Sequence, residues 1–335
     1  RPRTHLPHWL PPVHQQVTSS PGRVPKSERR SCEYDTPAGQ MIHGEVPDIL
    51  SEDPGRSLKG SAQLLLTSPP FPLNRKKKYG NKEGEEYVEW LADLAEPFAD
   101  MLTADGSLVI EMGNAWEAGR PTQSTLALEA LLAFKRRGDF HLCQEFIWFN
   151  PARLPSPIEW VNKRRIRVKD SFTRLWWLAR TPEPKADNRN VLQEYSGAMK
   201  KLLKRGSYYA GKRPSELDIG KPSFLVDNGG SIPPNVLTYP NTANRDDYHG
   251  YCKENGMALH PARMPEALAE FFVLFLTDPG DLVVDPFAGS NTTGAMAERH
   301  GRRWVSFEAN VEYIEGSRGR FADTNRANRS GEAAD

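Results

Sequence analysis

The chain has little cysteine and no long apolar run. Only three of its 335 residues are cysteine, at positions 32, 143 and 252, and no two of them form a C-x-x-C pair. This usage argues against a disulfide framework and against a zinc site, and it is typical of a reducing compartment. No stretch reaches the length of a membrane helix, and no apolar signal-peptide core follows Arg1. We therefore expect a cytoplasmic protein with no membrane contact and no bound metal.

Net charge is also low, at +1, but the charge is unevenly distributed. From Phe134 to Arg213 there are 19 Lys and Arg against 7 Asp and Glu, so this segment carries +12 and the remainder −11. A solvated face is the ordinary interpretation of charged residues. An imbalance over so long a segment instead favours a surface that faces nucleic acid.

Two further basic stretches lie before this segment. Residues 1–30 are rich in Pro and Ser and show no apolar periodicity, which predicts a flexible tail. The second stretch fits either a mobile loop that binds phosphates or a solvated face, and it consists of Arg75, Lys76, Lys77 and Lys78.

A strand, a turn and a helix follow one another near the end of the chain. Residues 282–285 form a short β-branched apolar run, typical of a buried parallel strand, and the G-x-G-x-x-G fingerprint of nicotinamide-binding turns is absent. A glycine in the turn lets the backbone approach a ligand closely, and a helix N-terminus suits a carboxylate or phosphate. We call residues 285–294 the glycine turn: Asp285, Pro286, Phe287, Ala288, Gly289, Ser290, Asn291, Thr292, Thr293 and Gly294.

A second strand, residues 304–308, ends on Glu308. The spacing is the one expected for a carboxylate that binds ribose hydroxyls. A plain α/β turn with a solvated glutamate fits the same residues.

Another buried strand, residues 64–66, is followed by the proline turn, which consists of Ser68, Pro69, Pro70 and Phe71. Ligands bind at the carboxyl ends of strands in open α/β sheets. The prolines remove N–H donors, so the turn offers only acceptors, namely the Ser68 hydroxyl and the Pro69 carbonyl, beside the ring of Phe71. These groups suit an amino group on a flat base, although a simple strand-ending turn also fits.

Together these segments resemble the β-class DNA amino-methyltransferases, and among them the cytosine-N4 enzymes of restriction-modification systems. The likeness runs from about Met41 to Phe321 and includes residues 148–151, 154–164 and 227–235. It implies an α/β fold, a circularly permuted class I methyltransferase (Rossmann-like) sheet with an inserted DNA target-recognition region. It also implies S-adenosyl-L-methionine as methyl donor. Adenine-N6 members usually carry Asp or Asn before Pro-Pro, so Ser68 favours cytosine.

The resemblance implies further site residues. Glu111, after an apolar strand, takes the place of a family Asp near the base, where its carboxyl group must be protonated to donate to ring N3. Glu45, also an Asp in the family, is expected at the adenosine part of the cofactor, and His260 and Arg263 at its methionine end. Phosphate contacts are expected from Lys163, Arg164, Arg165 and Arg167, whereas Lys212 and Arg213 are DNA-binding candidates whose side chains are capable of reading base edges.

Apolar periodicity predicts the remaining elements. We expect helices over residues 85–101, 124–137, 266–276 and 311–321, strands over 40–43, 107–111, 141–149 and 172–179, and no core pattern over 182–251. The expected organisation is a basic tail (1–35), a first catalytic part (36–181), a target-recognition region (182–256), a second catalytic part (257–322) and a tail (323–335).

The predicted function is transfer of a methyl group to N4 of a cytosine flipped out of duplex DNA. A companion restriction endonuclease would act on the same site, and no obligate protein partner is expected. Adenine-N6 methylation in the same fold, a catalytically weak DNA-binding relative, and an RNA or small-molecule methyltransferase stay open as alternatives.

Overall fold

The computed structural model describes residues 32–51, 55–71, 84–207, 211–212, 218–219, 225–242 and 246–321. The strands are β1 (Cys32–Asp35), β2 (Gly39–His43), β3 (Ala62–Thr67), β4 (Leu102–Gly113), β5 (His141–Phe149), β6 (Phe172–Ala179), β7 (Gly211–Lys212), β8 (Asp218–Ile219), β9 (Val236–Thr238), β10 (Leu282–Asp285) and β11 (Arg303–Glu308). The helices are α1 (Val46–Ser51), α2 (Gly84–Asp93), α3 (Ala95–Met101), α4 (Leu126–Arg137), α5 (Gly197–Arg205), α6 (Asp247–Glu254), α7 (Glu266–Leu276), α8 (Thr292–Arg299) and α9 (Val311–Ser317). Short helical turns are η2 (Gly55–Leu58), η3 (Glu159–Lys163), η4 (Asn188–Val191) and η5 (Arg318–Phe321).

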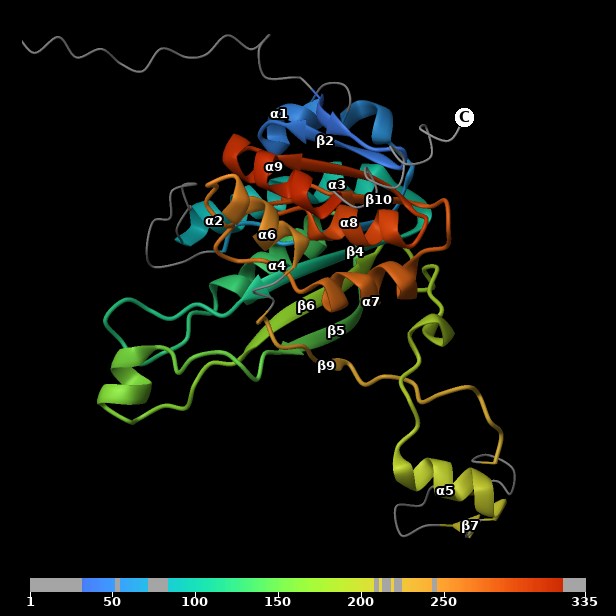
Figure 1. The fold of residues 1–335 in the computed structure, drawn as a ribbon. Helices are drawn as coiled ribbons and strands as arrows, with labels where there is room; N and C mark the ends of the chain where they lie inside the picture. The colour runs from blue at the N-terminus through green and yellow to red at the C-terminus, as the bar shows by residue number, and fades with distance from the viewer. Residues whose placement is uncertain are drawn as a thin grey trace, which may run out of the picture.

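Nine strands form one sheet in the order β1-β2-β11-β10-β3-β4-β6-β5-β9 (Figure 1). The central strands from β2 to β4 run parallel, and β6 lies antiparallel to both β4 and β5. The strand that precedes the glycine turn, β10, therefore pairs with β3, which precedes the proline turn, although the two are far apart in the chain. This is the permuted α/β arrangement that the sequence predicted.

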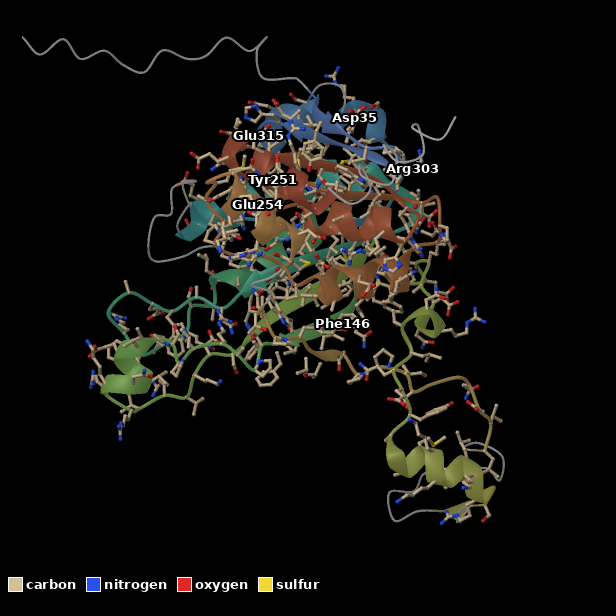
Figure 2. All side chains as sticks on the ribbon, in the orientation of Figure 1. Asp35, Phe146, Tyr251, Glu254, Arg303 and Glu315 are labelled. Atoms are coloured by element: carbon tan, nitrogen blue, oxygen red, sulfur yellow. The ribbon has the colours of Figure 1, made fainter. Side chains whose placement is uncertain are left out.

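Helices cover both faces of the sheet because buried strands are apolar on both sides. Leu65 of β3 joins the core beneath α2, α3 and α4, whereas Leu64 and Leu66 point to the opposite core beneath α7, α8 and α9. Phe146 of β5, labelled in Figure 2, packs edge-on against Phe272 of α7 with ring centroids 5.2 Å apart. Among the described residues, no helix is both long and apolar enough to cross a membrane.

Two arms extend away from this body (Figure 1). We call residues 150–171, between β5 and β6, the basic arm; it is drawn in green and contains η3. The second arm follows β6 and carries α5 and β7, drawn in yellow. It returns to the sheet through β9, which pairs in parallel with β5.

Three predictions about the elements were wrong in part. The helix expected over residues 85–101 is broken at Leu94 into α2 and α3, which turn at the sheet surface. The strand expected to end at Glu111 continues to Gly113, because it pairs with β6 as far as Thr173. The stretch expected to lack a core pattern contributes β9 to the sheet and most of α6, where Tyr248 is fully buried.

Candidate active site

The proline turn and the glycine turn meet at the carboxyl edge of the sheet. The hydroxyl of Thr67, at the end of β3, donates to Asp285 Oδ1, at the end of β10, over 2.8 Å. Beside them lies a cavity of about 400 Å³. Most of the predicted site residues line this cavity: Glu45, Ser68, Pro69, Pro70, Phe71, His260, Arg263, Asp285, Pro286, Phe287, Ala288, Gly289, Ser290, Thr292, Thr293 and Glu308.

The glycine turn is closely packed, both by its own residues and by His260 and Glu308. Gly289 has φ of +53°, and a Cβ at this position would lie 3.0 Å from Nε2 of His260. The Gly289 N–H donates to Glu308 Oε2 over 2.8 Å, and the N–H of Phe287 donates to Asp285. The backbone N–H groups of Phe287 and Gly289, which were expected to face a ligand, therefore form hydrogen bonds that hold the turn in place.

Asn291 does not line the cavity. Its backbone adopts a left-handed conformation. Its fully buried side chain caps α8 by accepting from the Gly294 N–H over 3.2 Å, while its amide nitrogen donates to the Tyr34 hydroxyl. Ser306 also donates to Asn291 Oδ1, over 2.7 Å. The side chain of Asn291 therefore shapes the turn from inside the core.

Two carboxyl groups lie at the glycine turn: Asp285 is buried and Glu308 is half-buried. Burial raises the pKa of Asp285 to about 6, against the opposing effect of hydrogen bonds from Thr293, Thr67 and the backbone. Burial likewise raises the pKa of Glu308, whose Oε1 accepts from the Asn310 N–H over 2.9 Å. Glu308 lines the cavity, and an ionised carboxylate there can accept hydrogen bonds. Such an acceptor is what the predicted contact with ribose hydroxyl groups requires.

Glu111 lies behind the proline turn and does not line the cavity directly. It is 5 % exposed, and its carboxyl group is hydrogen-bonded to Ser68. Burial raises the pKa of Glu111 to about 7, while the Ser68 hydrogen bond and the charge of Arg153 act in the opposite direction. When Glu111 is ionised, its carboxylate can only accept, so Ser68 is then the donor of this hydrogen bond.

Phe71 is held against the backbone at the end of β4. A Cβ at Gly113 would lie 3.2 Å from the Phe71 ring, so glycine at this position allows the ring to lie close to the strand. Sequence reasoning missed the aromatic side chains that complete this wall, because Tyr87 and Trp90 were interpreted only as the core face of a helix. Both line the cavity, and Trp90 contacts Phe287 with ring centroids 5.9 Å apart.

Arg153 was missed as well. Its Nη1 donates to the carbonyl of Phe172 over 3.2 Å, and its charge acts on Glu111. The sequence contained it only as one cation in a basic segment, with nothing local to connect it to β4.

Glu45, His260 and Arg263 all reach the cavity. Glu45 is exposed at its rim, just before α1. The His260 ring packs edge-on against Tyr313 with ring centroids 4.5 Å apart, and the backbone N–H of His260 donates to the Tyr248 hydroxyl. Arg263 donates to both oxygens of Asp246 over 3.3 and 3.2 Å.

The predicted DNA contacts fall into two groups. Lys163, Arg164, Arg165 and Arg167 lie exposed on the basic arm. The loop with Arg75, Lys76, Lys77 and Lys78 lies outside the described residues, as does Arg213, and only the backbone of Lys212 is described, in β7.

The chain is similar to known DNA methylases. A family model described as DNA methylase (N6_N4_Mtase) matches residues 62–318. The type II methyltransferase M.PvuII of Proteus hauseri is 48% identical over 294 residues, which cover 87% of this chain and 86% of that protein. The type II methyltransferase M.BglII of Bacillus subtilis is 26% identical over 278 residues, covering 82% and 67%.

The solved structure of the PvuII DNA methyltransferase (cytosine-N4-specific) has a similar fold. It matches with a TM-score of 0.70 and 40% identity, over 87% of this chain and 89% of that chain. The permuted sheet, the two turns at its carboxyl edge and the extent of these matches lead to one assignment: the chain belongs to the N6_N4_Mtase family of DNA methylases.

Proposed function

We propose that this DNA methylase transfers a methyl group from S-adenosyl-L-methionine to N4 of a cytosine in duplex DNA. The observation that carries the proposal is the Ser68–Glu111 hydrogen bond at the end of β3, beside the cavity that the glycine turn lines. The similarity to the PvuII DNA methyltransferase, which is cytosine-N4-specific, supports the choice of cytosine over adenine. A base stacked inside a duplex presents its amino group edge-on, so the reaction requires that the base be flipped out.

The cavity suits the methyl donor by its chemistry. It offers acceptors for ribose hydroxyls at Glu308 and Glu45, aromatic faces for an adenine ring, and Arg263 for a carboxylate. Its walls leave no room for a side chain at Gly289, where a Cβ would meet His260 at 3.0 Å. We assign cofactor binding to the residues of 285–293 that line the cavity, with Glu45, His260, Arg263 and Glu308.

S-adenosyl-L-methionine supplies the methyl group as an electrophile when it is bound. The Ser68 hydroxyl donates a hydrogen bond to Glu111, which leaves its lone pairs facing the cytosine amino group. One N–H of that amino group then donates to Ser68, and the other donates to the Pro69 carbonyl. Phe71 stacks on the base, and Pro70 keeps the turn rigid. These acceptors localise the nitrogen lone pair and align it, so catalysis comes from positioning and electrostatics.

Glu111 takes the proton that the reaction releases. The amino nitrogen becomes acidic as it gains its methyl group, and Ser68 relays the proton to the Glu111 carboxylate. A pKa of about 7 suits this carboxylate to accept a proton near neutral pH. The products are N4-methylcytosine and S-adenosylhomocysteine, with no covalent enzyme intermediate.

The basic residues of the arm and of the sequence before α2 contact phosphates in this proposal. Their charge steers and holds duplex DNA, while specificity comes from the target-recognition region at residues 182–256. We further propose that the protein works in the cytoplasm beside a companion restriction endonuclease that cuts the same site.

The test is a product analysis. The protein is incubated with tritiated S-adenosylmethionine and long duplex DNA of mixed sequence, the DNA is digested to nucleosides, and the label is identified by mass. Labelled N4-methylcytosine is the expected result, with far slower labelling by the Ser68→Ala variant and no label when RNA replaces DNA. Labelled N6-methyladenine would establish the alternative base. No labelled nucleoside, with cofactor binding intact, would overturn the proposal.

A further inference from the structure

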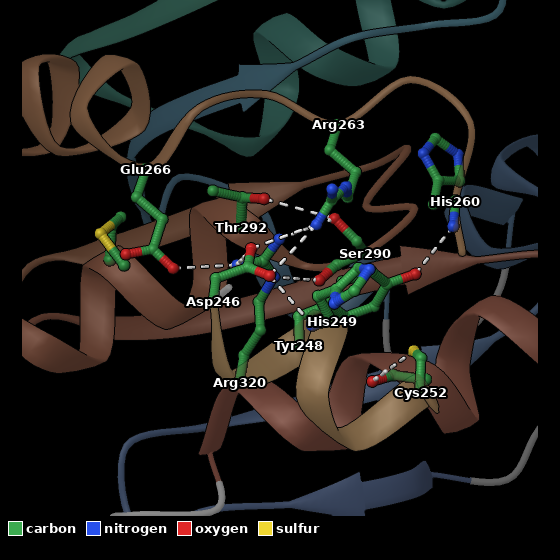
Figure 3. A network of polar contacts seen from close by, with 12 residues as sticks. Asp246, Tyr248, His249, Cys252, His260, Arg263, Glu266, Ser290, Thr292 and Arg320 are labelled. Atoms are coloured by element: carbon green, nitrogen blue, oxygen red, sulfur yellow. Dashed lines mark hydrogen bonds and ion pairs between the residues drawn. The ribbon is translucent and has the colours of Figure 1, made fainter. Parts of the chain in front are cut away.

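A buried network of charges lies behind the glycine turn and is separate from the groups that act on the base (Figure 3). Asp246, which precedes α6, binds two arginines that come from different parts of the chain. Its Oδ2 lies 3.2 Å from Nη1 of Arg263 and 3.7 Å from Nη1 of Arg320. Arg263 lines the cavity, so this carboxylate connects the cavity wall to the end of the described chain.

Arg320, on η5, holds the glycine turn directly. Its Nε donates to the Ser290 carbonyl over 2.6 Å, and its Nη2 donates to the Ser290 hydroxyl over 3.1 Å. The remaining nitrogen, Nη1, donates to Glu266 Oε1 over 3.1 Å, and the guanidinium lies over the Tyr248 ring at 4.9 Å. Ser290 itself lines the cavity.

The burial of Arg320 makes this arrangement dependent on its partners. Its side chain is only 2% exposed, and a buried cation is tolerated only where carboxylates and hydrogen bonds surround it. Because the guanidinium is planar, the two bonds to Ser290 and the bond to Glu266 fix its orientation as well as its position. Any loss of charge at Asp246 or Glu266 therefore changes how firmly Ser290 is held.

We propose that Arg320 and Asp246 are positioning residues for the methyl donor: Arg320 fixes Ser290 of the glycine turn, and Asp246 fixes Arg263, which also lines the cavity. This inference rests on the proposed use of the cavity for S-adenosylmethionine. Neither residue lines the cavity, and among the described residues neither makes a hydrogen bond or ion pair with the proline turn, so their loss should change cofactor affinity and leave the transfer step intact at saturating cofactor.

Asp246→Asn is the sharpest variant. Asparagine keeps the shape of the side chain and the N-cap of α6, where Asp246 accepts from the His249 N–H over 2.9 Å, so only the charge is removed. We expect KM for S-adenosylmethionine to rise roughly tenfold, the loss typical of a hydrogen bond to a charged partner, with kcat and KM for DNA unchanged. The matched control is Glu315→Gln, which removes the half-exposed pair with Arg318 in the same corner without touching Ser290.

Affinity is also measured directly, by calorimetry with S-adenosylhomocysteine, which separates this inference from the proposed function. If the wild type does not bind, the proposed function fails. If the wild type binds and Asp246→Asn binds equally well, or differs only in thermal stability, the positioning role is wrong. Arg320→Lys and Arg320→Met provide a second test: lysine keeps the charge and should retain part of the affinity that methionine loses. Equal affinities in these two variants would contradict a role for the charge.

Discussion

The glycine turn and the basic arm bind their partners by opposite means. In the turn, Thr292, Thr293 and Gly294 are buried, and backbone N–H groups are bonded to Asp285 and Asn291 within the turn and to Glu308 beside it, so its shape exists before any ligand arrives. The described residues of the arm include no buried side chain, and Leu154 and Val168 are 80% and 86% exposed. A preformed cavity suits a small cofactor that must be placed accurately, whereas an open, charged arm suits a long polyanion.

The largest expected effect on cofactor binding comes from adding a side chain at Gly289 in the glycine turn. In Gly289→Val, a β-branched residue must adopt φ of +53°, and its Cβ must share space with His260 at 3.0 Å. We expect binding of S-adenosylmethionine to be lost in calorimetry. Gly301→Val is the matched control, because Gly301 has φ of +73° but no atom within 4 Å of a Cβ. Unaltered affinity in Gly289→Val would contradict the assignment of the turn.

Removing one acceptor at the base should have the next largest effect. Ser68→Ala deletes the hydroxyl that links the amino group to Glu111. We expect kcat to fall by about a hundredfold, the usual loss for one group that stabilises a transition state, while cofactor affinity stays unchanged. Single-turnover measurement of methyl transfer at saturating cofactor checks this. Unchanged turnover would exclude a catalytic role for Ser68.

The sequence predicted these two turns because their signals are local. Apolar runs fix β3 and β10, prolines and a glycine interrupt them, and parallel strands bring their carboxyl ends to one edge. The boundaries of β5, β6 and α7 were also correct, or nearly so, because each has a clear apolar pattern between breaks.

The remaining features depend on contacts between distant residues. β9 has three residues and becomes a strand only by pairing with β5, so its own sequence shows no pattern. The charge of Arg153 lowers the pKa of Glu111, and Arg320 donates to the Ser290 carbonyl. In each pair the two residues are far apart in the sequence, so their spacing does not predict the contact. A basic residue in a basic segment gives no sign that its charge faces inward.

The pH dependence of kcat sharpens the contrast between buried and exposed charge. Since the pKa of Glu111 is raised to about 7 and the proposed role needs the carboxylate, kcat should rise about tenfold per pH unit below pH 7 and level off above it. Glu111→Gln should abolish this rise of kcat with pH. A rate that falls through pH 7 would instead show that protonated Glu111 donates to ring N3.

A change in the stability of the folded protein with pH cannot produce this rise in kcat. A carboxyl group whose pKa is raised in the folded state stabilises the protein fully below its unfolded pKa of 4.5, and this stabilisation is lost as pH rises through about 7. The Glu111 contribution to the free energy of unfolding thus decreases while kcat increases. Thermal melts at each pH serve as the control.

The smallest effect is expected on the basic arm, where each charge adds little alone. Arg165 is exposed and has φ of +54°, so Arg165→Asn removes the charge and keeps a residue that tolerates this conformation. We expect DNA affinity at low salt to fall by about a few-fold, and the slope of log K against log salt to decrease by about 0.9, one phosphate contact. Arg56→Gln, at an exposed cation on η2 outside the basic segment, is the control and should change neither. If both variants shift the slope equally, the attraction comes from the charge of the whole surface. If only Arg165→Asn does so, and cofactor binding is retained, the arm touches the DNA backbone while the glycine turn, with its internal hydrogen bonds, works independently of it.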